Sequence, residues 1–124
     1  MAGEAVRPLL IAELPGELDV VNCDATAAGL LAAVSAPGLV IADMTGTTFC
    51  DSAGMRILLA VHDRAGASGS VFRVAVEPGT SVARMMSLLG MDRVLSIYES
   101  VEAALPADCA AAAAGSVRRS RMPE

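Results

Sequence analysis

Four short, mostly apolar runs alternate along this chain with longer segments of mixed polarity. The runs cover residues 9–14, 39–44, 71–76 and 94–98, and Pro-Gly pairs follow the first and third of them. Their shortness and their β-branched residues predict strands rather than buried helices. Asp43 is the one charged residue in the second run, as expected for a strand that is covered on both faces.

The segments between these runs carry apolar side chains at helical spacing. They predict one helix over residues 21–34, a second over residues 52–65 that ends near Gly66, and a third that begins at Thr80 or Ser81. The residues expected on the apolar faces are Val20, Ala27, Leu31 and Val34, then Met55, Leu58, Leu59 and His62, and finally Val82, Met85, Met86 and Leu89.

A short fourth helix is predicted between a Ser100 cap and Pro106, so strands and helices alternate throughout. This alternation predicts an α/β fold with a largely parallel sheet of about four strands and about four flanking helices, since each crossover carries a helix. We therefore expect one domain over residues 9–105, after a flexible N-terminus at residues 1–8. Residues 106–124, with five consecutive alanines, are expected to be mostly disordered, with at most a helical turn at the alanines.

The composition is sufficient for one core and excludes several classes of partner. Hydrophobic residues make up 54% of the 124 residues, yet no uninterrupted apolar run reaches the roughly eighteen residues that a membrane-spanning helix needs. Since a signal-peptide pattern is also missing, we expect a cytoplasmic protein without membrane insertion. Residues 1–105 hold six Arg against twelve Asp and Glu, a net charge of −6, which argues against direct binding of nucleic acid.

Residues 39–56 display a serine beside an aspartate at the predicted start of the second helix. A nucleophilic serine in an elbow motif would need glycine two positions before Ser52, where the chain has Cys50. The one histidine, His62, lies ten residues along the same predicted helix, which is about 15 Å at 1.5 Å per residue. Asp51 has no acid, Lys or His placed to assist it. We therefore predict no catalytic residue.

Metal and cofactor sites are not predicted either. The three cysteines, Cys23, Cys50 and Cys109, are widely spaced, and a lone histidine has no companion ligands. No glycine belongs to a dinucleotide-binding motif or a phosphate-binding loop. We interpret Cys50 as a small buried apolar residue, with redox sensing as the minor alternative.

Two roles remain for Ser52 on local chemistry alone. As an ordinary N-cap it would contribute about 1 kcal/mol to helix stability. As a phosphorylation site it would place an anion at a helix start, where free N–H groups and the helix dipole favour negative charge. The local residues do not decide between these roles.

The wider sequence resembles a known family. The segment VIADMTGTTFCDSAGMRILLAVHDRA follows GELD at residues 16–19 and precedes LLGMDRVLSIYESVEAAL. In this order and spacing, the three pieces resemble a STAS domain of the anti-sigma factor antagonist type, from about residue 9 to about residue 105. The resemblance implies a small α/β fold with a mixed sheet, in which the first strand can pair antiparallel.

The resemblance also implies a role for Ser52. In that family the serine after the aspartate of a D-S-x-G motif is phosphorylated by a partner kinase that is also an anti-sigma factor. The unphosphorylated antagonist binds the kinase and frees a sigma factor, and a serine phosphatase restores it, so a non-enzymatic regulator is implied. Ala53 departs from many members, which have a second serine there. The implied partner-binding residues are Asp19, Asn22, Thr45, Thr47, Asp51, Ser52, Ala53, Gly54, Met55 and Arg56.

Two other functions stay open. A STAS subunit of a transport assembly or other multiprotein complex would be docked permanently, and its Ser52 would carry no phosphate. A ligand-sensing module would need a buried pocket, and the sequence offers no ligand-specific residues for one. Self-association also stays open.

Overall fold

The computed structural model describes residues 8–106 and 117–122, and it has an α/β architecture. The main sheet has five strands in the order β6-β5-β3-β1-β7, and every described pairing is parallel. These strands are β1 (Leu9–Glu13), β3 (Leu39–Asp43), β5 (Val71–Ala75), β6 (Ser96–Tyr98) and β7 (Val117–Arg121). The predicted α/β fold and mostly parallel sheet are confirmed.

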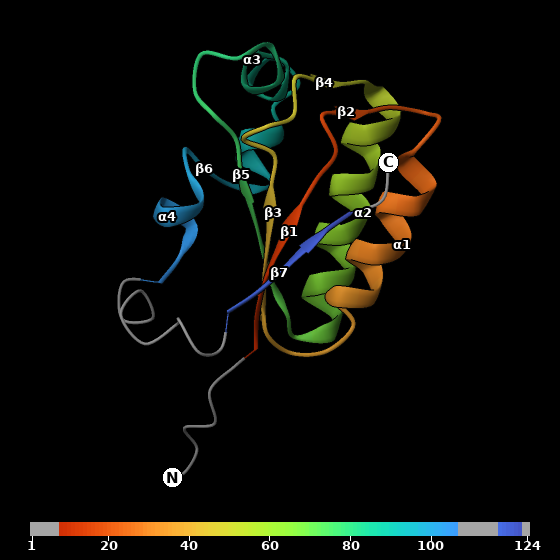
Figure 1. The fold of residues 1–124 in the computed structure, drawn as a ribbon, viewed down its shortest axis with the longest axis vertical. Coiled ribbons are helices and arrows are strands. Elements are labelled where there is room, and N and C mark those ends of the chain that lie inside the picture. The colour runs from red at the N-terminus through yellow and green to blue at the C-terminus, as the bar shows by residue number, and fades with distance from the viewer. Residues whose placement is uncertain (1–7, 107–116, 123–124) are drawn as a thin grey trace, which may run out of the picture.

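Helices cover both faces of this sheet. They are α1 (Cys23–Ala33), α2 (Ser52–Ser68), α3 (Ser81–Leu88), the 3-10 helix η2 (Met91–Arg93) and α4 (Val101–Ala104). Figure 1 shows α1 and α2 side by side on one face, α4 on the other, and α3 at the upper end of the molecule. All four predicted helices are therefore present.

The alternation of side chains along the strands divides the core in two. The larger cluster lies between the sheet and α1, α2 and α3, and includes Leu30, Val40, Leu58, Val74 and Met86. The smaller cluster lies on the α4 face, and consists of Leu9, Ile11, Leu39, Ile41, Ala75, Val101 and Ala104. Successive side chains of a strand point to opposite faces, so β1 and β3 contribute to both clusters.

A second, two-stranded parallel sheet lies at the upper end, formed by β2 (Glu17–Leu18) and β4 (Phe49–Cys50). Sequence patterns did not predict it, because two-residue strands carry no periodicity. It joins the turn before α1 to the loop before α2.

The sheet itself corrects three expectations. It has five strands rather than about four, and β1 pairs in parallel with β3, so the antiparallel first strand implied by the resemblance is absent from the described residues. The fifth strand, β7, falls within residues 106–124, which we expected to be mostly disordered. The alanines of that tail lie outside the described residues, as does most of the N-terminus at residues 1–8.

The end of α2 and the buried faces of α1 and α3 also differ from the prediction. Helix α2 continues past Gly66 to Ser68, and Gly69, with φ +73°, provides the left-handed C-cap. Within α1 the buried residues are Cys23, Thr26 and Leu30. Of the predicted set, Val34 is buried just after the helix, Ala27 and Leu31 are half-buried, and Val20 is exposed. In α3 the predicted core residues Val82 and Met86 are buried, but Met85 and Leu89 are exposed.

Candidate functional site

The start of α2 is built around the carboxylate of Asp51. Asp51 is the N-cap, and its Oδ1 accepts a hydrogen bond from the backbone N–H of Gly54 at 3.0 Å. Ser52 is therefore the first residue of the helix, and its side chain is exposed. The cap therefore lies one residue before Ser52, at Asp51. The alternative role of Ser52 as an ordinary N-cap is removed with it.

The second oxygen of the same carboxylate ties this start to a distant segment. Asp51 Oδ2 accepts a hydrogen bond from the backbone N–H of Val20 at 3.2 Å, and the N–H of Asp51 donates to the carbonyl of Leu18 at 3.1 Å. The short β2–β4 pairing continues this contact. The segments around Asp19 and Ser52, which the resemblance assigns to one surface, thus lie side by side.

Asp19 and Asn22 hold the turn that precedes α1. Asp19 Oδ1 accepts hydrogen bonds from the N–H groups of Val21 and Asn22 at 3.0 and 3.3 Å, and Asn22 Oδ1 accepts from the N–H of Asp19 at 3.0 Å. The side-chain amide of Asn22 also donates to the carbonyl of Glu17 at 2.6 Å. Both residues are half-buried, so they stiffen the turn and leave part of each side chain accessible.

Gly54 lies where α2 packs closely against the small sheet. A Cβ atom at this position would lie 2.7 Å from Cys50 Sγ, 2.9 Å from Leu18 Cγ and 3.0 Å from the Leu18 carbonyl oxygen. Each distance is shorter than carbon normally allows. The glycine of the D-S-x-G motif is therefore required by packing beneath the site.

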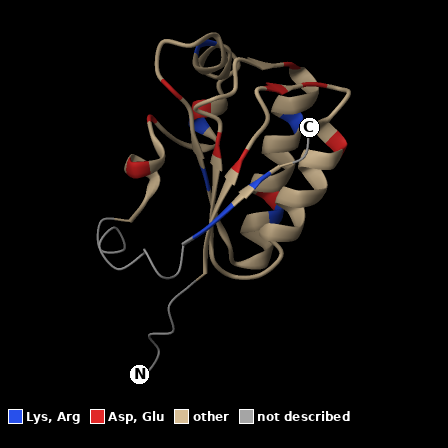
Figure 2. Cartoon of the chain, viewed as in Figure 1, with Lys and Arg blue, Asp and Glu red and all other residues tan. Residues whose placement is uncertain are grey.

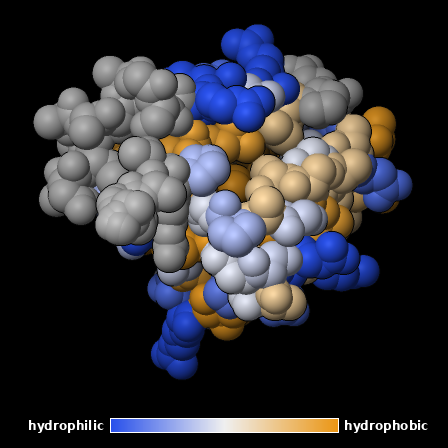
Figure 3. Space-filling model, turned by 90° about the horizontal axis from the view of Figure 1, so that it is seen from below, coloured by the Kyte–Doolittle hydropathy of each residue, from blue (hydrophilic) through white to orange (hydrophobic). Residues whose placement is uncertain are grey.

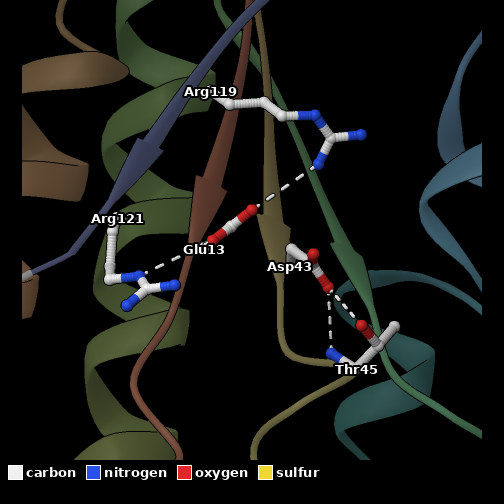
Figure 4. A network of polar contacts seen from close by, with 5 residues as sticks. All are labelled: Glu13, Asp43, Thr45, Arg119 and Arg121. Atoms are coloured by element: carbon white, nitrogen blue, oxygen red, sulfur yellow. Dashed lines mark hydrogen bonds and ion pairs between the residues drawn. The ribbon is translucent and has the colours of Figure 1, made fainter.

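The loop between β3 and β4 is held at two threonines. Thr45 donates both its backbone N–H and its hydroxyl to Asp43 Oδ1, at 3.0 and 2.6 Å (Figure 4). The hydroxyl of Thr47 is buried and donates to the carbonyl of Pro15 at 2.8 Å. These bonds satisfy polar groups that would otherwise be costly to bury, and they fix the path of the chain toward Ser52.

The implied partner-binding residues divide by exposure. Ser52 and Arg56 are exposed, whereas Asp19, Asn22, Thr45, Asp51 and Ala53 are half-buried. Thr47, Gly54 and Met55 are buried. The accessible part of the set thus lies on the turn before α1, the loop between β3 and β4 and the first two turns of α2, while the buried part packs beneath it.

Exposed apolar side chains at the same end of the molecule were not among the implied residues. Val21 is 88% exposed, Val20 71% and Phe49 49%, and on the neighbouring α3 three more large apolar side chains are exposed. The hydroxyl of Ser81 at the start of α3 donates to the carbonyl of Thr48 at 3.4 Å, which connects the helix to the loop. We define the apolar rim as Val20, Val21, Phe49, Met85, Leu88 and Leu89.

A signal for this rim was present in the sequence. Helix α3 has apolar residues on more of its circumference than Val82 and Met86 need to cover the core. We expect the methionines of this stripe to pack in the core, with a partial partner-facing role as the minor alternative. An apolar face wider than the core contact is typical of a binding surface.

The charges around Ser52 are mainly negative. Acidic residues mark the turns at the upper end of the molecule in Figure 2. Asp51 directly precedes Ser52, Asp19 lies in the segment that is hydrogen-bonded to Asp51, and Arg56 lies about one helical turn beyond the serine. Burial, with a further contribution from the Asp51 carboxylate, raises the pKa of the Cys50 thiol to about 12. The thiol is therefore protonated at neutral pH, which disfavours the redox-sensing alternative.

The described residues contain neither a metal-binding cluster nor a membrane-spanning helix. No group of three or more His, Cys, Asp or Glu residues at 8–106 and 117–122 is arranged to hold a metal ion. Over the same ranges, no helix combines the length and the hydropathy needed to cross a membrane.

Comparisons with known proteins point to one family. The family model described as the STAS domain matches residues 4–104. A crystal structure of a candidate anti-sigma factor antagonist from Thermotoga maritima superposes with a TM-score of 0.61 at 20% identity, covering 73% of this chain and 79% of that one. An anti-sigma-factor antagonist (STAS) domain protein from Planctomyces limnophilus gives a TM-score of 0.62 at 22% identity, covering 72% and 77%. No curated protein matches the sequence. At these identities the structural likeness supports the fold.

Proposed function

The chain belongs to the STAS domain family, and from this we propose that it is a cytoplasmic anti-sigma factor antagonist switched by phosphorylation of Ser52. It is a non-enzymatic binding protein. Its unphosphorylated form binds an anti-sigma factor that is also a serine kinase, and the bound kinase releases a sigma factor. The kinase ends the interaction by phosphorylating Ser52, and a serine phosphatase reverses it.

The observation that carries this proposal is that Asp51, and not Ser52, caps α2. Asp51 makes the capping bond of α2, so the helix does not need the serine hydroxyl. Ser52 is exposed at the first helical position and is free to be modified. A hydroxyl that capped the helix would have to break that bond to accept a phosphate.

The same position also suits a phosphate once it is attached. The first N–H groups of a helix have no intrahelical acceptor, and the helix dipole favours an anion there. Arg56 follows Ser52 by four residues, the spacing at which side chains of a helix face one another, and it is exposed. Phosphorylation should therefore leave the fold intact.

For a partner that covers this surface, the phosphate should weaken binding even though it leaves the fold intact. The apolar rim provides exposed apolar contact area at the same end of the molecule. A phosphate adds about −1.5 to −2 charge beside Asp51, and two unit charges about 4 Å apart near a surface interact by roughly 4 kcal/mol. Since 1.4 kcal/mol is about tenfold in affinity, half of that energy is enough for a switch.

The test uses two serines at equivalent positions. Ser52 and Ser81 are the first residues of α2 and α3, and both are exposed. Wild type, Ser52→Ala and Ser81→Ala are incubated with candidate serine kinases of the anti-sigma type and ATP, and intact mass is measured. We expect one phosphate on wild type and on Ser81→Ala, and none on Ser52→Ala.

Binding to the kinase that passes this test is then compared before and after incubation with ATP. Wild type should lose affinity by roughly tenfold or more, and Ser52→Ala should not change. Identical behaviour of the two proteins would refute the proposal. A permanently docked subunit of a transport assembly would instead keep an unchanged mass and co-purify with its complex.

A further inference from the structure

The strand β7 forms one edge of the main sheet and, within the described residues, pairs with β1 alone. The N–H of Met122 donates to the carbonyl of Glu13 at 2.7 Å, which fixes the side of the strand that faces β1. Because the backbone groups of successive residues in a strand point to opposite sides, the even-numbered residues of β7 face β1. The N–H and C=O groups of Arg119 and Arg121 therefore point away from the sheet, toward the place of a further strand.

This edge is basic, although residues 1–105 are acidic, with six Arg against twelve Asp and Glu. Arg118, Arg119 and Arg121 are all exposed, and β7 is basic in Figure 2. Among the described residues, the ion pairs of this strand are those of Arg119 and Arg121 with Glu13, and they are long, at 3.7 and 3.8 Å (Figure 4). Exposed pairs of this kind are weak, so the guanidinium groups remain available to other carboxylates.

The other face of β7 leaves room for apolar side chains. Since side chains alternate along a strand, Arg118, Ser120 and Met122 lie on the face toward α1. There a hollow of about 610 Å³ lies between β7 and α1, and the helix lines it with alanines and Gly29. Figure 3, which views the molecule from below, shows hydrophobic surface exposed between strongly hydrophilic side chains. A strand added beside β7 can therefore direct apolar side chains toward this hollow.

Together these features define one kind of partner. The outward N–H and C=O groups pair with extended backbone, the arginines attract carboxylates, and the hollow accepts apolar side chains. We propose that the outer edge of β7 binds an acidic, extended segment of a partner protein by strand addition. Alternating acidic and apolar residues in that segment place carboxylates beside Arg119 and Arg121 and apolar side chains on the α1 face.

Two other occupants fit this edge less well. The β7 strand of a second copy would bring its own arginines against these, and like charges on neighbouring strands are destabilising. A nucleic acid needs a continuous basic surface, whereas Arg121 is followed across the sheet by its register partner Glu13 and then by Asp43. An acidic peptide needs only the edge itself. The inference does not depend on the phosphorylation of Ser52.

A synthetic peptide tests the strand addition directly. The probe is a hexapeptide of alternating Glu and Val with an acetylated N-terminus and an amidated C-terminus, added to the isotope-labelled full chain and followed by NMR. We expect chemical-shift changes centred on β7 and, at saturating peptide, slower hydrogen exchange at the amides of Arg119 and Arg121, which point outward. The amides of Arg118 and Ser120 face β1 and are the internal control, so their exchange should change little.

Two further changes separate backbone pairing from charge. A peptide with the same side chains but with every backbone nitrogen methylated keeps its charge and donates no backbone hydrogen bond, so it should bind at least about tenfold more weakly. In the protein, Arg119→Glu combined with Arg121→Glu should also weaken binding of the first peptide by at least about tenfold. Arg64→Glu combined with Arg84→Glu makes the same charge change at exposed positions of α2 and α3, and it should have little effect.

Several results would overturn the proposal. Equal binding of the two peptides would assign the attraction to charge alone, and an equal loss in the two double variants would assign it to net charge rather than to β7. Chemical-shift changes centred on another element, or no binding at millimolar peptide, would place no strand at this edge. A single-stranded oligonucleotide that binds β7 more tightly than the acidic peptide would make the edge a phosphate-binding surface instead.

Discussion

Helices α2 and α3 begin with the same local arrangement at the same end of the molecule. Asp51 caps α2 through the N–H of Gly54, and Thr80 caps α3 through the N–H of Ala83 at 3.2 Å. In each helix the next residue is an exposed serine. Judged by local sequence, both starts could display a hydroxyl beside free N–H groups.

Tertiary contacts make the two starts different. The second carboxylate oxygen of Asp51 accepts from Val20 on another segment, whereas the Thr80 hydroxyl donates to its own neighbour, the carbonyl of Glu77, at 2.8 Å. The hydroxyl of Ser81 already donates to Thr48. Local residues are thus enough to start both helices. Only at the start of α2 does the cap also bind a second segment, at Val20, so that two segments together form the surface around Ser52.

Substitution at the third helical position should give the largest difference in stability between the two helix starts. Gly54→Ala gives α2 the residue that α3 has at Ala83, but its Cβ would meet Cys50 and Leu18 at 2.7–3.0 Å. We expect a loss of about 1–3 kcal/mol in the free energy of unfolding, despite the better helix propensity of alanine. Urea denaturation measures it. The converse change, Ala83→Gly, should cost about 0.5–1 kcal/mol, and an equal or stabilising result for Gly54→Ala would show that α2 is not closely packed there.

Removal of each cap is the next comparison. Asp51→Ala loses the capping bond and the tie to Val20, and we expect a cost of about 1–2 kcal/mol, against about 1 kcal/mol for Thr80→Ala. Hydrogen exchange at the Val20 amide should also rise in Asp51→Ala. Asp51→Asn keeps an acceptor oxygen toward Gly54 and serves as the control. Unchanged protection of Val20 in Asp51→Ala would contradict the proposed tie between the two segments.

The residue before the cap provides a pH-dependent comparison, since α2 has Cys50 there and α3 has Gly79. The pKa of the Cys50 thiol rises from 9.0 to about 12 on folding, through burial and the Asp51 charge. The unfolded chain therefore loses this proton first, so its contribution to stability is complete below pH 9 and is lost as pH rises toward 12. The free energy of unfolding should fall less between pH 8 and pH 10 in Cys50→Ala than in wild type. The same fall in both proteins would assign the pH dependence to other groups.

A charge at the first helical position should have the smallest effect on stability. Ser52→Asp and Ser81→Asp each place an anion at a helix N-terminus, and we expect both to unfold within about 0.5 kcal/mol of wild type. Thermal and urea denaturation measure this. Marked unfolding of Ser52→Asp would refute the argument that α2 accepts a phosphate at its start.

Local sequence was sufficient for most of the elements. Apolar runs located β1, β3 and β5, and helical spacing with polar caps located α2, α3 and α4, because burial and capping leave a direct mark on residue order. Strand β7 escaped prediction because its basic residues, Arg118, Arg119 and Arg121, show no apolar alternation. An edge strand that is held mainly by backbone hydrogen bonds does not need alternating apolar residues.

What the sequence by itself determined is the α/β order of the chain and the display of Ser52 at a helix start, since both depend on residues within a few positions of one another. The tertiary structure decided which residue caps that helix, which apolar side chains stay exposed, and that segments thirty residues apart meet at Asp51. Those outcomes depend on packing between elements, which cannot be predicted from the spacing of residues within one element. The serine is therefore predicted locally, and its surroundings are a product of the fold.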